Sequence, residues 1–213
     1  MLQRYGSQET LEQLLIGQFS ITQFSVMRLW GESWDWLGDR LAASVLTIPS
    51  LMDWGICLAV LAVYAAIAFP VGFRLRFLQQ EWVTNPQTIV ASTLVALIFP
   101  SIFEEVIFRG LLLPHPAEAA STATIVLWSI VSLVLFVVAH PLNALLVLTS
   151  RRATFYDGTF LTLAGLLGVA CTVTYLQSGS LWTAIGLHWA VVVVWLLSLG
   201  GDRRMSAQNE PDR

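Results

Sequence analysis

Five long apolar segments, separated by short polar stretches, dominate the hydrophobic pattern of the chain. Each is about 20 residues long, the length that an α-helix needs to cross a bilayer. The predicted spans are roughly 54–73, 88–113, 122–140, 159–177 and 181–199. The third either ends at His140 or continues as a broken helix through Pro141 to Leu148. The pattern predicts an all-α fold, a polytopic transmembrane helical bundle whose last two spans form a hairpin around Gly179.

The region before the first span has a different pattern. Residues 11–30 mix apolar side chains with Gln and Ser, which is too polar for a span and typical of an interfacial amphipathic helix. Trp30, Trp34 and Trp36 are expected at the level of the lipid headgroups. Residues 41–52 are apolar but short. They either re-enter the membrane or belong to a further crossing, so we expect five or six spans.

Composition agrees with a membrane protein. The chain is 56% hydrophobic and 12% charged, with a mean hydropathy of +0.69, whereas soluble domains carry about 25% charged residues. We therefore predict an integral, multi-pass protein with the lipid bilayer as part of its solvent. The net charge of −3 and the absence of a basic stripe argue against nucleic-acid binding. The predicted regions are an N-terminal interfacial region (1–53), a transmembrane catalytic-type bundle (54–199) and a polar C-terminal tail (200–213).

Arginines alternate between the loops. They follow the first, third and fifth spans at Arg74, Arg76, Arg151, Arg152, Arg203 and Arg204, and the loops 114–121 and 178–180 contain none. Cytoplasmic loops carry an excess of basic residues. We therefore expect the arginine-bearing loops and the C-terminus to face the cytoplasm.

Two adjacent glutamates within the second span are the first candidates for chemistry. A charged group at membrane depth costs a few kcal/mol on insertion scales, so Glu104 and Glu105 need an explanation. Glu105 and Arg109 lie four residues apart and can pair on one helix face, whereas Glu104 points about 140° away. Glu104 is thus the group expected to take a proton from water and return it. Alternatively, both glutamates only pair across helices to hold the bundle together.

Two histidines in later spans extend this set. His140 ends the run SLVLFVVAH and His188 lies in GLHWAVVVVW, whereas His115 lies in a loop between prolines. A single histidine on an apolar face is often only a hydrogen-bonded core residue. Two of them, together with a buried glutamate pair, are able to polarise a water, bind a metal or relay protons.

The motifs resemble those of a known family. EEVIFR (104–109), FVVAH (136–140) and a histidine in a later span are similar to the EExxxR, FxxxH and HxxxN/D motifs of the CAAX-protease and bacteriocin-processing (CPBP, or Abi) family of intramembrane glutamic endopeptidases. The resemblance covers roughly residues 88–199. It implies that Glu104 with His140 activates a water, that Glu105 and Arg109 brace the site, and that His188 stabilises the oxyanion.

The last motif departs from the family pattern. Position 192, where the resemblance implies Asn or Asp, is Val. Losing one oxyanion donor typically costs about 10²- to 10³-fold in rate. Asn143, three residues after His140 and on its face, is a candidate substitute, although it is equally suited to capping a helix break after Pro141.

The predicted function is therefore that of a peptidase, an intramembrane endopeptidase acting on a membrane-embedded or lipidated peptide or protein substrate. Val192 keeps a second hypothesis open, a non-catalytic family member that acts as a membrane binding or scaffold protein. A proton-relay transporter is a third. No cofactor is expected. His140, His188 and a glutamate are nevertheless zinc-ligand types, so zinc is not excluded.

Overall fold

The computed structural model describes residues 35–206. The chain divides into two compact units, Met1–Asp39 and Arg40–Arg213, and the following description concerns the second. The predicted interfacial helix at 11–30, with Trp30 and Trp34, lies outside the described residues. Trp36 is described and is exposed.

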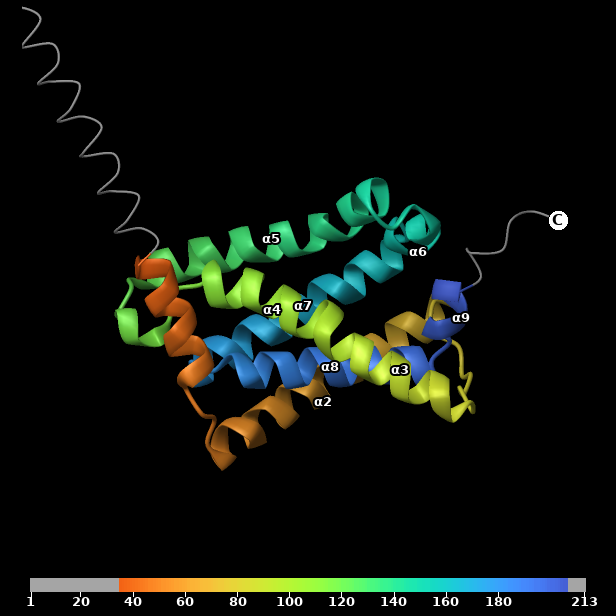
Figure 1. Ribbon diagram of the computed structural model, residues 1–213, viewed down its shortest axis with the longest axis horizontal. Coiled ribbons are helices and arrows are strands. Elements are labelled where there is room, and N and C mark those ends of the chain that lie inside the picture. The colour runs from red at the N-terminus through yellow and green to blue at the C-terminus, as the bar shows by residue number, and fades with distance from the viewer. Residues whose placement is uncertain (1–34, 207–213) are drawn as a thin grey trace, which may run out of the picture. The chain divides into compact units, whose positions relative to one another are not determined.

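The five predicted spans are confirmed within the described part of the chain (Figure 1). They are α2 (Leu51–Arg74), the segment Pro86–Glu118, α5 (Thr122–Leu146), α7 (Gly158–Ser178) and α8 (Leu181–Ser198). Residues 41–52 do not form a sixth crossing, because helical structure stops at 46 and resumes at Leu51. Residues 35–206 therefore contain five spans, whereas the sequence was compatible with five or six.

Each span starts at a residue whose side chain caps the helix. Polar side chains accept hydrogen bonds from the first free backbone N–H groups of a helix and stabilise its start. These capping residues are Ser50, Asn85, Ser121, Asp157 and Ser180. At the other end of α7, Gly179 has a left-handed conformation (φ +69°) that permits the tight turn into α8. The predicted hairpin of the last two spans is thus confirmed.

Two boundaries differ from the sequence prediction. The first span begins at Leu51 rather than near 54, because Ser50 and Asp53 form a capping box that places the acidic residue in the first turn. The third span does not break at Pro141, since α5 continues to Leu146. Proline is tolerated inside transmembrane helices when the surroundings satisfy the freed backbone groups.

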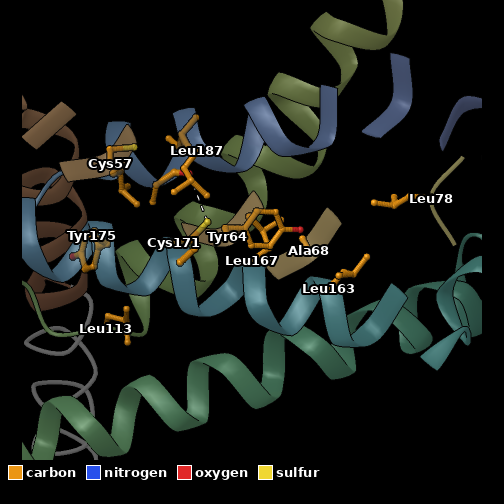
Figure 2. Packing of buried hydrophobic residues seen from close by; sticks show 14 of the residues in the cluster. Cys57, Tyr64, Ala68, Leu78, Leu113, Leu163, Leu167, Cys171, Tyr175 and Leu187 are labelled. Atoms are coloured by element: carbon orange, nitrogen blue, oxygen red, sulfur yellow. Dashed lines mark hydrogen bonds between the residues drawn. The ribbon is translucent and has the colours of Figure 1, made fainter. Parts of the chain in front are cut away.

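Helix α7 lies at the centre of the bundle and packs against α2, α5 and α8. Figure 2 shows its side chains Leu163, Leu167 and Cys171 beside Tyr64 of α2 and Leu187 of α8. In contrast, α2 and α5 expose much of their apolar surface, as expected for helices that face lipid.

Arg40, His115 and Glu118 form a polar cluster at one end of the bundle. The guanidinium of Arg40 donates to both carboxylate oxygens of Glu118 at 2.6 Å. His115 begins the short helix η3 (Pro116–Glu118), and its Nε2 lies 3.0 Å from the carbonyl oxygen of Gly179. His115 therefore ties the loop after the second span to the α7–α8 turn.

The arginine-bearing loops meet at the opposite ends of the spans. Short helices η4 (Thr149–Arg151), α6 (Arg152–Phe155) and α9 (Gly201–Ser206) lie in these segments. Arg204 donates to the carbonyl oxygens of Phe77 and Arg76, and its own carbonyl accepts from the Thr154 hydroxyl. The segments around Arg76, Thr154 and Arg204 thus lie close together. This agrees with the predicted topology, in which these three loops share one face of the membrane.

Candidate functional site

The second span is irregular where it carries the two glutamates. It comprises α3 (Pro86–Ala96), η1 (Leu97–Ile102), α4 (Phe103–Glu105) and η2 (Val106–Leu111), of which η1 and η2 are widened π-type turns. Phe99 leaves helical geometry (φ −127°, ψ 113°) next to Pro100, which cannot donate a backbone hydrogen bond. The second span is therefore kinked at Phe99 and Pro100. Widened turns of this kind often occur at functional sites.

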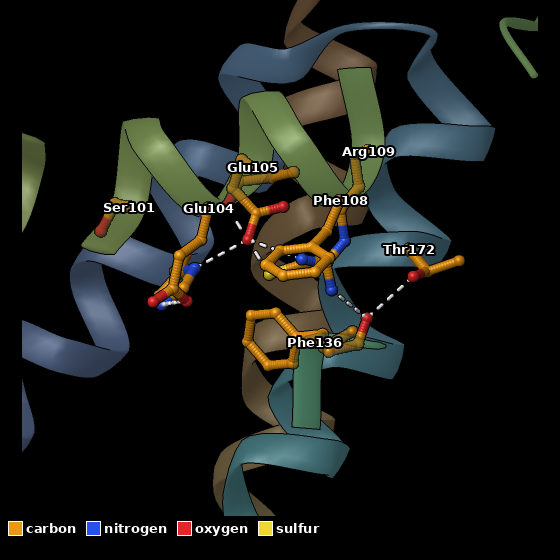
Figure 3. A network of polar contacts seen from close by, with 12 residues as sticks. Ser101, Glu104, Glu105, Phe108, Arg109, Phe136 and Thr172 are labelled. Carbon is orange, nitrogen blue, oxygen red and sulfur yellow. Dashed lines mark hydrogen bonds and ion pairs between the residues drawn. The ribbon is translucent and has the colours of Figure 1, made fainter. Parts of the chain in front are cut away.

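Glu105 is completely buried and is held from two sides (Figure 3). Its Oε1 accepts a hydrogen bond from Nη1 of Arg109 at 3.0 Å and from Nδ1 of His188 at 2.7 Å. The predicted pairing of Glu105 with Arg109 is confirmed. Because an ionised carboxylate only accepts, Nδ1 of His188 carries the hydrogen of this bond. Glu105 therefore fixes the orientation of the imidazole.

Arg109 is anchored by α5 and α7. Its Nη2 donates to the carbonyl oxygen of Gly168 at 2.8 Å, and its guanidinium lies over the Phe136 ring, 4.7 Å from the centroid. A buried cation is stable only when it is paired and hydrogen-bonded. Glu105 and Gly168 accept from Nη1 and Nη2 and Phe136 covers the guanidinium face, whereas the buried Nε has no hydrogen-bond partner within residues 35–206.

Gly168 is needed for this contact. A Cβ atom there would lie 2.8 Å from Cδ1 of Leu133, 3.1 Å from Cδ1 of Phe136 and 3.3 Å from Nη2 of Arg109. We expect Gly168→Ala to displace the guanidinium and to lower peptidase activity about tenfold or more, the range for small misplacements in active sites.

Gly165→Ala is the matched control for this prediction. The nearest atom to a Cβ at Gly165 is 3.6 Å away, an ordinary van der Waals contact. Purified variants should be compared by cleavage rate and thermal unfolding. Equal rates for the two variants would show that close packing at Gly168 does not matter to the site.

Glu104 lies on the other side of His188. Its Oε2 is 4.0 Å from Nε2 of His188, too far for a direct hydrogen bond. The side chain is 16% exposed, yet Oε2 is buried and has no hydrogen-bond partner within residues 35–206. The imidazole of His188 thus lies between two carboxylates, one engaged and one free to accept a proton.

His140 is connected to this group through an aromatic ring. Nδ1 of His140 donates to the Phe136 carbonyl oxygen at 2.9 Å. The Phe136 ring contacts the rings of both His140 and His188, with centroids 5.1 and 6.0 Å apart. Among the described residues, His140 has no hydrogen bond to Glu104. Hydrogen bonds therefore join Glu105 to Arg109 and His188. Glu104 lies beside His188 at 4.0 Å, and His140 is connected to His188 across the Phe136 ring.

Asn143 and Val192 add no donor to the cluster. The side chain of Asn143 is exposed and has no hydrogen bond to the residues of this cluster in the described part of the chain. Its carbonyl accepts from the N–H groups of Val147 and Leu148 at the end of α5. Asn143 does not cap a break after Pro141, because the helix does not break there.

Cys171 and Gly168 of α7 were not identified from the sequence. Ligand atoms of Glu105, Cys171 and His188 all lie within 4.8 Å of one another, so carboxylate, thiol and imidazole are grouped as in some zinc sites. The sequence had suggested His140 in place of Cys171. Arg109 already compensates the charge of Glu105, and a metal ion there would lie close to its guanidinium. No local pattern around either α7 residue distinguishes it from an ordinary core position.

The fold and the site define a polytopic helical membrane protein with a buried cluster of carboxylates, arginine and histidine. The family model of type II CAAX prenyl endopeptidases, Rce1-like, matches residues 86–194, just over half of the chain. The chain belongs to this family of CAAX-type membrane proteases. The match spans Glu104, Glu105, Arg109, His140 and His188, and it confirms the resemblance that the motifs indicated. No curated protein and no solved structure matches the chain.

Proposed function

We propose that the protein is a glutamate-type intramembrane endopeptidase that hydrolyses a peptide bond of a membrane-embedded or lipidated substrate with a water activated by Glu104. One observation carries the proposal: Glu104 is partly exposed and has a carboxylate oxygen without a hydrogen-bond partner beside His188, within residues 35–206. Glu105 also has one oxygen without a partner there, but it is fully buried and its Oε1 is held by Arg109 and His188. A general base needs an unoccupied acceptor within reach of water.

The charges of the cluster support different roles for the two glutamates, with Glu104 as the base and Glu105 as a structural partner. Arg109 balances Glu105 in a fully buried pair. The proposed reactive form is the charged one, in which Glu104 is a carboxylate and His188 has a hydrogen on both ring nitrogens, because its Nδ1 already donates to Glu105. In the charged form, Glu104 accepts a proton from water while Nε2 of His188 carries a hydrogen for the oxyanion. This form has both groups that the first step requires.

The proposed reaction proceeds in two steps. The water oxygen attacks the substrate carbonyl carbon as Glu104 takes its proton, and His188 donates a hydrogen bond to the resulting oxyanion. Glu104 then returns the proton to the peptide nitrogen as the C–N bond breaks. His140 orients the water through Nε2, which is an acceptor in the neutral ring because Nδ1 donates to the Phe136 carbonyl.

The test is cleavage by the purified protein in lipid vesicles. The probe is a peptide that ends in farnesylated Cys-Val-Ile-Met, a CAAX sequence, compared with the same peptide without the lipid. Added hydroxylamine should leave a free carboxylic acid as the product, because water attacks directly. A hydroxamate product would reveal a covalent acyl intermediate and contradict the mechanism.

Val192 favours a second candidate, a membrane scaffold that retains the family pocket without catalysis. The residue lies one turn after His188 and offers no hydrogen-bond donor. Under this alternative, a Glu104→Gln protein would still support the cellular phenotype. Loss of the phenotype with Glu104→Gln, at normal protein levels, would exclude the scaffold.

A further inference from the structure

Three tryptophans lie on α8, and their indole N–H groups have different partners. Nε1 of Trp182 donates to the carbonyl oxygen of Val45 at 2.9 Å, and Nε1 of Trp189 donates to that of Thr93 at 3.0 Å. Nε1 of Trp195 is buried and has no hydrogen-bond partner within the described residues. An unpaired buried donor is destabilising and needs an explanation.

The ring of Trp195 is held in place, so its N–H does not reach a partner by rotation. Phe77 stacks on it with centroids 6.0 Å apart and planes at 15°. Gly201 lies so close that a Cβ there would be 2.9 Å from Cε2 of the indole, the atom bonded to Nε1. A rigid ring with an unpaired donor is suited to bind a group from outside the chain.

Trp195 is also connected to the candidate active site. It lies seven residues after His188, and two helical turns return it to nearly the same face of α8. The Phe160 ring contacts both Trp195, at 5.9 Å, and His140, at 5.2 Å. Seven residues of helix rise about 10 Å, which equals about three residues of an extended peptide.

The family motif adds a reason to look for a donor here. Its expected Asn or Asp lies four residues after the last histidine, where this chain has Val192. Trp195 lies one turn further along the same face and carries an N–H without a partner. It supplies a donor for a neutral acceptor, which suits a peptide carbonyl.

We propose that the indole N–H of Trp195 donates a hydrogen bond to a backbone carbonyl of the peptide substrate, about three residues from the bond that is cut. This inference rests on the proposed endopeptidase function and adds a substrate-binding residue to it.

Trp195→Phe tests the role because it removes the N–H and keeps an aromatic ring. We expect KM for the farnesylated peptide to rise about three- to tenfold with little change in kcat, since one neutral hydrogen bond to bound substrate is lost. Trp189→Phe is the matched control. It removes an N–H that bonds within the chain, so it should lower the unfolding temperature and leave KM unchanged.

A second measurement does not depend on cleavage, and it uses the Trp195 variant only to assign one resonance. The Glu104→Gln protein, labelled with 15N-tryptophan, is titrated with the farnesylated peptide in lipid nanodiscs. The indole resonance that is missing in Trp195→Phe should move downfield on binding. A resonance that stays in place while the peptide binds would overturn the proposal, and the N–H would then bond only to water.

The two measurements separate this inference from the proposed function. Cleavage without a shift of the Trp195 resonance would reject only the hydrogen bond to substrate. If the Trp195 resonance shifts but the unmodified protein does not cleave the peptide, only the proposed hydrolysis is rejected. An unchanged KM in a well-folded Trp195→Phe protein would also count against the inference.

Discussion

A Glu104→Gln variant is expected to lose peptide hydrolysis by about 10²- to 10⁴-fold, the contribution of a positioned general base. Glutamine has nearly the same shape but cannot take a proton from water. Because Oε2 of Glu104 has no hydrogen-bond partner within residues 35–206, the substitution should break no hydrogen bond of this oxygen in the resting protein. The folded protein should therefore survive while kcat falls.

Glu81→Gln is the matched control for this variant. Glu81 pairs with Arg203 at the arginine-bearing end of the spans, and both side chains are exposed. Cleavage rates of the two variants should be measured in the same vesicles, with circular dichroism to verify folding. Full activity of Glu104→Gln would remove the glutamate from the mechanism and leave His140 and His188 as the remaining bases.

Arg109→Met should have the largest effect on stability. The methionine side chain fills much of the space but leaves Glu105 buried without its cation. It also removes the Arg109 hydrogen bond to the Gly168 carbonyl, which keeps the Thr172 hydroxyl as a donor. Removing one partner of a buried ion pair costs about 3–5 kcal/mol, so we expect a large drop in unfolding free energy, measured by denaturant titration in mixed micelles.

A double variant makes the cause of that loss testable. Glu105→Gln combined with Arg109→Met removes the uncompensated charge, and stability should recover in part while activity stays low. Arg203→Met is the control, because its exposed pair with Glu81 should contribute about 1 kcal/mol or less. If the double variant is no more stable than Arg109→Met, charge burial is not the reason for the loss.

Local features of this chain were predictable from the sequence. The five spans follow from hydropathy, and the Glu105–Arg109 pair follows from helical spacing alone. The start of the first span was predicted near 54, after Asp53, whereas the helix begins at Leu51. The Ser50–Asp53 capping signal is visible in the sequence, and it explains why an acidic residue belongs to the first turn.

Contacts between distant segments were not predictable. His188 meets Glu105 across 83 residues of sequence, and that contact depends on how α8 packs against the irregular second span. Likewise, Gly168 matters because Leu133, Phe136 and Arg109 all approach α7 there. Spacing rules describe one helix at a time, so they assigned Glu105 to Arg109 and left its second partner undetermined.

The separation of Glu105 and His188 also has a consequence for biogenesis. A ribosome adds about 5–20 residues per second, so roughly 4 to 17 s pass between synthesis of the glutamate and of the histidine, 83 positions later. During that interval the nascent second span has Arg109 as the partner of Glu105 but not yet His188. The α7–α8 hairpin, joined by its short turn at Gly179, completes the pocket last. Newly inserted chains should therefore be most vulnerable to quality-control proteases just before this final hairpin docks.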